Sequence, residues 1–376
     1  MDAWVATHAE EIARRAEREL DALVGVSTPS GDRAGAEEAV AITTALLPDA
    51  AAVTRLPCST PDHADDLLAI VRGTGSRRIL LLGHLDTVVD HAGHGPLRVA
   101  GDRLYGPGTV DMKGGDVLAL GVLRALAAGP AAFAEAGLLL VNDEEWRTHD
   151  FAHAQRFAGW DACLCFEAGE RGPGGEEGVV CTRKAAGTLH VEARGAAAHS
   201  GSAPERGRNA LVALAAVALR VASHHDPDGP DELTAVPTIL RAGSAMNVVP
   251  PHGELFCDLR ARTLPAFEPV LADVPSEHEG VSIESTQLRR WPGMDTREAA
   301  AGALASASAR LGRAVIGVGR GGASDASHLA TTVPLTVDGL GPRGGGAHTP
   351  GEYVLRDSLR SRAEVALAVA AAVLDA

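Results

Sequence analysis

Residues 78–87 read Arg-Ile-Leu-Leu-Leu-Gly-His-Leu-Asp-Thr, a short apolar run that ends at a histidine. The run predicts a buried β-strand. His84 then lies just beyond the carboxyl end of that strand, where open α/β sheets hold their ligands. Asp86 is placed to accept the second ring N–H of this histidine. Taken alone, the pair is more readily explained by a core histidine whose ring nitrogens are hydrogen-bonded within the protein, or by chance.

Strands and helices alternate on both sides of this stretch. An amphipathic helix is expected over 4–24, where apolar residues recur at helical spacing. Further buried strands are predicted at 67–72, 137–142 and 161–166, with a helix over 112–128. Strands interleaved with helices indicate an α/β fold, with a mixed, largely parallel sheet that is flanked by helices.

The pattern becomes α+β from about Lys184 and changes back after Pro292. Because 376 residues are too many for one ordinary domain, we expect two hydrophobic cores. A catalytic domain in two parts, 1–183 and 292–376, should surround an inserted domain, 184–291. The expected elements of these parts are strands at 187–194, 236–242, 253–260, 280–285, 314–318 and 334–338 and helices at 206–223, 297–311 and 357–375. The alanine runs 131–136 and 366–372 are expected to be ordinary helix.

Four further segments place an acid or a histidine at the end of a strand or in a loop. Asp111 lies in a glycine-rich loop before a predicted helix, where an N-cap is the simple explanation, although the glycines would let backbone approach a crowded site. Glu144 and Glu145 follow a predicted strand; a solvated patch is the alternative, but cations would relieve their repulsion. Glu167 follows the next strand, and His348 lies in a second glycine-rich loop.

Two histidines and three acids together form the mixed nitrogen and oxygen set that suits zinc or a similar divalent ion. No cysteine joins the set, which argues against a structural zinc site. The order and spacing resemble the co-catalytic di-zinc family of carboxypeptidase G, acetylornithine deacetylase, succinyl-diaminopimelate desuccinylase and aminoacylase, most closely its carboxypeptidase G and glutamate carboxypeptidase members. The motifs that carry the resemblance are His84-x-Asp86, Asp111-Met-Lys-Gly-Gly, Glu144-Glu145, Glu167 and His348.

The resemblance implies a zinc-exopeptidase-like fold with an inserted lid and dimerisation domain, and two metal ions. Asp111 would bridge the ions. His84 and Glu167 would complete one site, and Glu145 and His348 the other. The ions are expected to be Zn²⁺, with Co²⁺ or Mn²⁺ as alternatives, because oxygen-rich sites accept these as well.

The same resemblance implies that Glu144 is the general acid/base and that Asp86 supports the metal site from behind. Two cations lower the pKa of a bridging water, and Glu144 could take its proton and pass it to the departing nitrogen. We therefore expect a metal-dependent hydrolase that cleaves a peptide or N-acyl bond adjacent to a free carboxylate. The alternatives are an N-deacylase of a biosynthetic intermediate, of the acetylornithine or succinyl-diaminopimelate type, and a non-catalytic ligand-binding homologue.

Within the insertion, the resemblance implies that His199 reaches a cleft, often that of the partner subunit, and donates to the oxyanion. The alternative is a histidine that packs beside the following helix. Lys184, Asn247 and Arg260 are suited to a substrate carboxylate, although Arg260 could also be a plain surface residue. Ser324 lies in a Gly-Gly-Ala-Ser-Asp loop that lines the substrate cleft in the family.

Two positions depart from the family pattern. Trp291 stands where close glutamate-releasing relatives would have another arginine, and Trp146–His149 replace the small residues that usually follow the acidic pair. The identity of the released residue therefore stays open.

Composition limits the partners. The formal charge is −15 and the basic residues are scattered, so nucleic-acid binding is not expected. Five cysteines without a Cys-x-x-Cys spacing do not indicate a disulfide scaffold. Neither a signal peptide nor a membrane span is recognisable. We expect a cytoplasmic enzyme for a small-molecule substrate, and the resemblance implies a homodimer formed through the inserted domain.

Overall fold

The computed structural model describes residues 1–129 and 132–375. The chain forms two compact units. Unit 1 comprises Met1–Thr182, Asp295–Arg320 and Ser324–Ala376, and unit 2 comprises Arg183–Met294 and Gly321–Ala323. Each unit contains a hydrophobic core of its own, so the expectation of two cores is confirmed.

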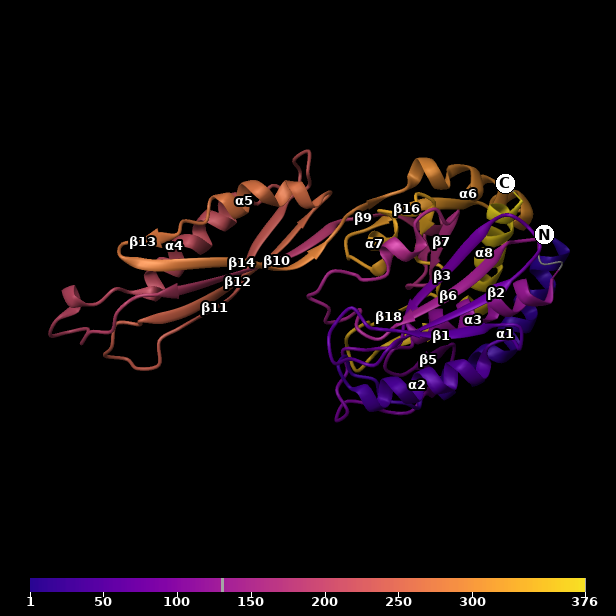
Figure 1. Ribbon diagram of the computed structural model, residues 1–376, viewed down its shortest axis with the longest axis horizontal. Coiled ribbons are helices and arrows are strands. Elements are labelled where there is room, and N and C mark those ends of the chain that lie inside the picture. The colour runs from indigo at the N-terminus through magenta and orange to yellow at the C-terminus, as the bar shows by residue number, and fades with distance from the viewer. Residues whose placement is uncertain (130–131, 376) are drawn as a thin grey trace. The chain divides into compact units, whose positions relative to one another are not determined.

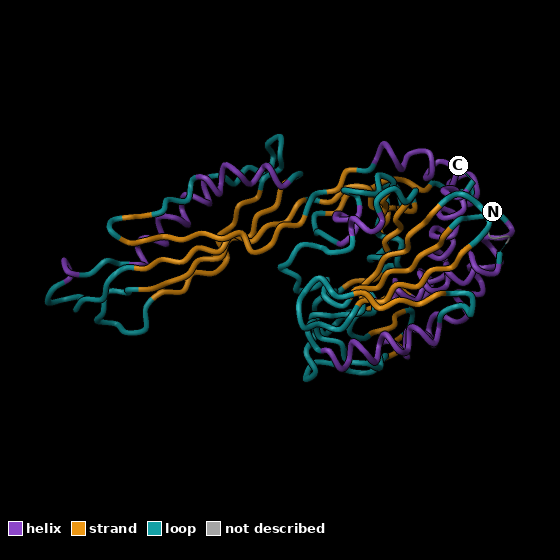
Figure 2. The backbone as a smooth tube through the Cα atoms, viewed as in Figure 1, coloured by secondary structure: helices purple, strands orange, loops and turns teal. Residues whose placement is uncertain are grey.

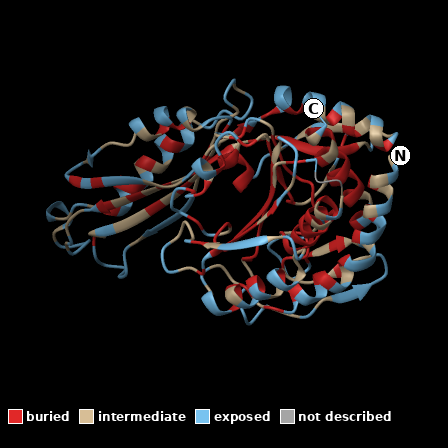
Figure 3. Ribbon diagram, turned by 45° about the vertical axis from the view of Figure 1, so that its right-hand side comes forward, coloured by how far each residue is buried: buried red, intermediate tan, exposed pale blue. Residues whose placement is uncertain are grey.

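A six-stranded mixed sheet lies at the centre of unit 1, in the order β1-β2-β6-β3-β7-β17. The strands are β1 (Ala52–Leu56), β2 (Asp66–Arg72), β3 (Arg78–His84), β6 (Glu135–Val141), β7 (Ala162–Cys165) and β17 (Thr336–Val337). β6, β3, β7 and β17 run parallel, whereas β1 and β2 pair antiparallel. β3 and β6 are buried along almost their whole length, since both faces of the sheet are covered. These buried strands are red in Figure 3.

Helices flank this sheet, which confirms the expected fold class (Figure 1). The helices of unit 1 are α1 (Ala3–Val24), α2 (Arg33–Leu46), α3 (Lys113–Ala128), α6 (Arg297–Leu311), α7 (Asp325–Leu329) and α8 (Arg356–Leu374). α1 begins at Asp2, whose carboxylate accepts the N–H of Trp4 at 2.8 Å. α3 and α8 pack against β3, and α1 packs on both helices.

The two alanine runs have different structures. Residues 366–372 lie in α8, as expected. Residue 131 of the other run lies outside the described residues, and the run leads into β6 instead of a helix. Ala136 pairs with Val71 of β2 and Ile79 of β3. Pairing between two strands therefore overrides the helix propensity of alanine at this position.

Several elements of unit 1 were not expected from the sequence. α2 is one of them, although Asp32 caps it by accepting the N–H of Gly35 at 2.9 Å. Most of the others lie in two small sheets. One consists of β8 (Glu170–Arg171), β9 (Glu177–Arg183), β15 (Met294–Asp295) and β16 (Val315–Arg320), of which β16 alone corresponds to a predicted strand, at 314–318, and the other of β4 (Arg98–Ala100), β5 (Arg103–Tyr105), β18 (Gly344–Gly345) and β19 (Tyr353–Leu355). These strands are mostly short, which makes their apolar patterns hard to recognise.

Unit 2 is a five-stranded antiparallel sheet in the order β11-β12-β10-β14-β13. Its elements are β10 (Ala185–Arg194), α4 (Ala210–Ser223), β11 (Thr234–Ala242), β12 (His252–Ala261), α5 (Glu268–Ala272), β13 (Glu277–His278) and β14 (Val281–Trp291). α4 packs against β10, β11 and β12 (Figure 2). α4 begins later than predicted because Asn209 caps it, accepting the N–H groups of Leu211 and Val212.

Two expectations from composition can be compared with the fold. Among the described residues, none of the helices has both the length and the apolar character that crossing a bilayer requires. All five cysteines are free thiols, as expected for a chain without a disulfide scaffold.

Candidate metal centre

Three neighbouring parallel strands of unit 1 bring their predicted ligands to one edge of the sheet. His84 is the last residue of β3, and Glu145 and Glu167 follow β6 and β7. β3 lies between the other two strands. Because parallel strands end at the same edge, these side chains converge although they are far apart in the sequence.

A close contact between α3 and the end of β7 allows Asp111 to join them. A Cβ atom at Gly115, in the first turn of α3, would lie only 1.9 Å from the carbonyl oxygen of Phe166. The glycine therefore allows the start of this helix to contact the segment that carries Glu167. Asp111 lies just before α3, and its Oδ1 is 3.3 Å from His84 Nε2.

The predicted ligands form two groups that share Asp111. In each group the ligand atoms lie within 4.8 Å of one another. In the first, His84 Nε2 is 3.3 Å from Asp111 Oδ1 and 3.8 Å from Glu167 Oε1. In the second, His348 Nε2 is 3.0 Å from Asp111 Oδ2 and 3.2 Å from Glu145 Oε2. Ligand atoms around a tetrahedral zinc ion are roughly 3.3 Å apart, so both groups fit such an ion.

The charges of these groups favour a bound cation. Contacts with Asp111 and Glu145 raise the pKa of His348 to about 10. Burial alone would lower the pKa of His84, but its contacts with Asp111 and Asp86 raise it well above the usual value. The neighbouring carboxylates therefore favour a protonated, positively charged ring at both histidines. A metal ion can replace that charge by displacing the protons.

Glu144 belongs to neither ligand group. It is 7% exposed. Burial raises its pKa well above the usual value; the charge of His84 opposes the shift, whereas those of Asp325 and Glu167 add to it. Burial favours the protonated form of this carboxyl group, whereas a cation bound nearby would favour the ionised form. A group balanced between the two forms is suited both to accept and to donate a proton.

Asp86 contacts more of the site than the sequence indicated. His84 Nδ1 lies 3.0 Å from the backbone oxygen of Asp86 and 3.4 Å from its carboxylate. The carboxylate also accepts the backbone N–H groups of Glu144 and Glu145, each at 3.1 Å. Asp86 therefore connects one predicted ligand to both residues of the acidic pair.

Two buried residues that support Asp111 were missed in the sequence. Glu352 accepts the backbone N–H groups of Gly108, Val110 and Asp111 at 2.8–3.0 Å, and burial raises its pKa to about 7. The Lys113 ammonium donates to the backbone carbonyls of Leu23, in the last turn of α1, and of Val26, just after that helix, and burial lowers its pKa to about 8. Glu352 lies four residues after His348, and this proximity was the one indication of a role in the sequence. Its hydrogen bonds to the loop before α3 could not be predicted, because no local sequence pattern indicates them.

The predicted residues of unit 2 lie at two ends of its sheet. Lys184 and Arg260 are at the end where the chain enters and leaves the unit, and Arg260 is adjacent to Ala186 in the register. His199 and Asn247 lie beyond the other end, where the N–H of Ser200 donates to the carbonyl of Asn247 at 3.0 Å. The ten residues of β10 separate the two ends by roughly 30 Å.

Each of these side chains has a defined environment. Lys184 contacts Glu232, and Arg260 donates both a 3.0 Å and a 3.1 Å hydrogen bond to Asp258. His199 is exposed, and its Nδ1 accepts the backbone N–H groups of Gly201 and Ser202. In the neutral ring Nε2 must then carry the proton and act as a donor.

Three other residues singled out in the sequence have clear positions. Ser324, in unit 1, is fully buried and donates to Asp338 at 2.6 Å. Trp291 is also buried, and the Arg289 guanidinium lies 4.3 Å from its ring centre. Trp146, in contrast, is 66% exposed directly after Glu145.

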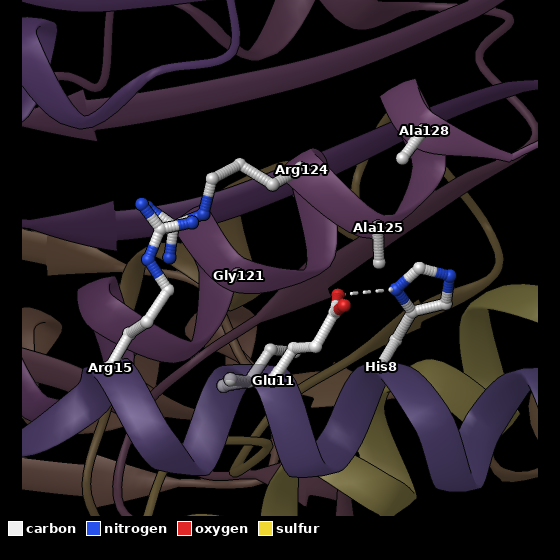
Figure 4. Close-up of a pocket in the computed structure, with 8 residues that line it drawn as sticks. His8, Glu11, Arg15, Gly121, Arg124, Ala125 and Ala128 are labelled. Atoms are coloured by element: carbon white, nitrogen blue, oxygen red, sulfur yellow. Dashed lines mark hydrogen bonds and ion pairs between the residues drawn. The ribbon is translucent and has the colours of Figure 1, made fainter.

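A small cleft between α1 and α3 contains none of the predicted residues (Figure 4). Its volume is about 170 Å³. Two of its arginines, Arg15 and Arg124, form ion pairs with the buried Glu19, and His8 contacts Glu11. The charged side chains that line the cleft are therefore paired within the chain.

Comparison with known proteins places the chain among metallopeptidases. Residues 80–372 match the family described as peptidase family M20/M25/M40. The chain is 28% identical over 352 residues to carboxypeptidase G2 of Pseudomonas sp., which covers 89% of this chain and 83% of that protein. Among solved structures, aminopeptidase PepT of Bacillus cereus has a TM-score of 0.78 at 20% identity, covering 96% of this chain and 98% of that one. A metallo-carboxypeptidase of Sulfolobus solfataricus has a TM-score of 0.70 at 15% identity and covers both chains fully.

Proposed function

Because the chain belongs to peptidase family M20/M25/M40 and is a metal-dependent amide hydrolase, we propose that it cleaves a peptide or N-acyl bond adjacent to a free carboxylate. One observation carries the proposal: Asp111 offers one oxygen to each of two ligand groups, and the buried Glu144 lies outside both groups. The N-deacylase and the non-catalytic homologue are not favoured.

The metal ligands in this proposal are the five side chains of the two groups. His84, Asp111 and Glu167 would hold one divalent ion, and Asp111, Glu145 and His348 the other. Zn²⁺ is the proposed ion at both positions, and Co²⁺ or Mn²⁺ could replace it. Two such cations acidify the attacking water and polarise the scissile carbonyl.

Glu144 is proposed to move the proton. Its carboxylate would accept a proton from the water and later donate it to the leaving nitrogen, because an amine leaves poorly unless it is protonated. Asp86 would hold the backbone of Glu144 and Glu145 in place through its two hydrogen bonds. His199 would donate from Nε2 to the developing oxyanion, which is consistent with the acceptor role of its Nδ1.

Three side chains of unit 2 are proposed to bind the substrate carboxylate, and Ser324 is proposed to support the cleft. Lys184 and Arg260 lie at the same end of the sheet and carry positive charges. In this structure both engage acidic residues, Glu232 and Asp258, and a substrate carboxylate would exchange with those partners. Asn247 lies at the opposite end, beside the segment of His199.

The two ends of unit 2 support a homodimer. A compact substrate cannot contact both ends of one sheet that are roughly 30 Å apart. We propose that His199 and Asn247 serve the site of the partner subunit. Eight of the twelve exposed large apolar side chains among the described residues lie in unit 2, which is under a third of the chain. They include Leu211 and Leu219 on α4 and Ile239 on β11, the edge strand.

The proposed reaction is tested with the full chain loaded with Zn²⁺ or Co²⁺. Dipeptides and N-acyl amino acids are compared with the same compounds that carry a carboxamide in place of the free carboxylate. We expect the carboxamides to be poor substrates, and chelation to abolish activity. Glu144→Gln should lower kcat by roughly 100- to 10,000-fold without loss of bound metal.

Each part of the proposal has its own contrary result. Full activity of Glu144→Gln would exclude Glu144 as the general acid/base, and full activity of the chelated protein would exclude the requirement for metal. Equal cleavage of the carboxamides would exclude recognition of a carboxylate while leaving the mechanism intact. The exposed Glu10→Gln variant is the control, since Glu10 lies on α1 and forms an exposed ion pair with Arg360.

A further inference from the structure

A buried arginine follows the acidic pair of unit 1. Arg147 lies two residues after Glu145, and its side chain is 0% exposed. One guanidinium nitrogen, Nη1, donates to Asp143 Oδ1 at 3.0 Å, and Nη2 donates to Asp325 Oδ1. The ring of Phe151 lies 4.7 Å from the guanidinium carbon. The side chain is therefore held by two carboxylates and an aromatic face.

These contacts join three segments that are distant in the sequence. The other oxygen of Asp143, Oδ2, accepts the backbone N–H of Thr60 at 2.8 Å and its hydroxyl at 2.7 Å. Asp325 is the first residue of α7. The segment 143–147 is thus attached to the loop before β2 through Asp143, and to the start of α7 through Arg147. We call this segment the acidic segment.

The acidic segment is held from a second side by Asp86. Asp86 accepts the backbone N–H groups of Glu144 and Glu145 at 3.1 Å each. Arg147 anchors the residues that flank these two, through Asp143 on one side and its own backbone on the other. With both attachments in place, the backbone between them has little freedom, and the directions of the Glu144 and Glu145 side chains follow from it.

The charges explain why an arginine occupies this position. Asp143 and Asp325 are both nearly fully buried, and a buried charge costs several kcal/mol unless it is paired. A guanidinium presents its donors as a planar fork and can satisfy two carboxylates at once, whereas an ammonium is a point charge. Arg147 therefore supplies hydrogen-bond donors to two buried acids directly behind the acidic pair.

We propose that Arg147 is a positioning residue for hydrolysis, which sets the placement of Glu144 and Glu145 by bridging Asp143 and Asp325. The inference rests on the proposed function, since it assigns Arg147 to the same site. Arg147 belongs to neither ligand group, so its effect passes through the acidic segment. Shifts of about 1 Å in a catalytic group can cost on the order of 100-fold in rate.

The test uses Arg147→Gln and Arg147→Lys in the full chain. We expect Arg147→Gln to lower kcat by about 10- to 100-fold, as is common for residues that orient metal ligands, with little change in KM. Its affinity for Co²⁺, followed by the visible absorption of the bound ion, should fall because Glu145 is displaced. Arg147→Lys retains the positive charge, so its kcat and its affinity for Co²⁺ should fall less than those of Arg147→Gln.

Arg124→Gln is the matched control. Arg124 also pairs with a buried carboxylate, Glu19 at 2.7 Å, and donates to the carbonyl of Leu46 at 3.0 Å. It lies about eleven residues along α3 from Lys113, a distance of roughly 16 Å along the helix axis. We expect this variant to lower the melting temperature and to leave kcat and the Co²⁺ spectrum unchanged.

The outcomes separate positioning from stability. If Arg147→Gln melts earlier, as Arg124→Gln does, but retains the kcat and Co²⁺ affinity of the parent, the proposal is wrong. If Arg147→Gln does not fold, Arg147→Lys decides: a parental kcat overturns the proposal, and a reduced kcat at an unchanged melting temperature supports it. Failure of the proposed function would appear in the parent protein, as an absence of amide hydrolysis. The Co²⁺ titration would still report whether Arg147 positions Glu145.

Discussion

A single carboxylate, that of Asp86, contacts both a proposed metal ligand, His84, and the backbone of the acidic pair. It is 2% exposed, and burial alone would raise its pKa. The contact with His84 and the bonds from Ser30 and the N–H of Glu145 lower that pKa below the usual value. Asp86 is therefore ionised and accepts hydrogen bonds at both oxygens. An amide at this position could accept at one oxygen only.

We predict that Asp86→Asn lowers kcat/KM by about 10- to 100-fold, the range found for partners of metal ligands. The new NH₂ group would face a backbone N–H of the acidic pair, and that donor would lose its acceptor. Steady-state kinetics with Zn²⁺-loaded protein measure the effect. Asp90→Asn, an exposed change in the same loop, should be silent; equal kinetics in both variants would argue against the role of Asp86.

At the level of helices and strands, Glu177 of β9 forms ion pairs with arginines from three other segments of unit 1. Its carboxylate lies 2.7 Å from Arg343 Nη1, 3.0 Å from Arg362 Nη1 and 3.5 Å from Arg313 Nε. Arg362 lies in α8, and Arg343 precedes β18 in the segment that leads to His348. The cluster therefore holds the glycine-rich loop of His348 against the rest of the unit.

We predict that this cluster makes unit 1 more stable at neutral than at acidic pH. Burial alone would raise the pKa of Glu177, but Arg362 and Arg343 lower it below the ordinary value of 4.5. The unfolded chain then binds the proton more readily than the folded one, so stability is present above pH 4.5 and is lost as the pH falls below it. Glu177→Gln should cost about 3–5 kcal/mol at pH 7, because the buried Arg343 and Arg362 lose their acidic partner.

Urea unfolding of both proteins between pH 3.5 and 7 measures this difference. The difference in free energy of unfolding between the parent and Glu177→Gln should decrease as the pH falls. The reason is that the parent loses the carboxylate charge at low pH, whereas the variant lacks it at every pH. A constant gap would show that the carboxylate charge is not the cause. Glu17→Gln, which breaks an exposed pair with Arg356, should differ from the parent by less than about 1 kcal/mol throughout.

At the scale of the whole molecule, the fold is shared by relatives that act on different ends of a peptide. An aminopeptidase and a metallo-carboxypeptidase both resemble this chain over nearly its full length. The choice of substrate therefore depends on side chains and on the assembly, and the proposed homodimer is the part of the assembly that can be tested most directly.

We predict that the protein has twice its chain mass of 38.6 kDa in solution, and that Leu219→Glu combined with Ile239→Lys produces monomers. Leu219 is 73% exposed on α4 and Ile239 is 41% exposed on β11, so charges there should oppose an apolar interface without disturbing the core of unit 2. Light scattering after size exclusion gives the mass. Val99→Glu, an exposed position in unit 1, is the control, and a monomeric parent protein would refute the prediction.

Much of the fold was predictable because it depends on local pattern. The apolar runs at 78–83 and 137–142 predicted β3 and β6, and helical spacing predicted α1, α3 and α8. Short edge strands such as β4 and β18 were missed, since two or three residues carry no readable period. Glu352 and Lys113 were missed for another reason: their partners are backbone groups in distant loops.

Local sequence pattern was sufficient to predict the order of the strands along the chain, the chemical types of the predicted ligands and the apolar faces that form two cores. The three-dimensional arrangement was needed to find that Asp111 lies within 3.3 Å of both His84 and His348, and that Arg147 bridges Asp143 and Asp325. The physical reason is that propensity and periodicity act over a few residues. Convergence of side chains depends instead on which strands pair and which helices pack between them.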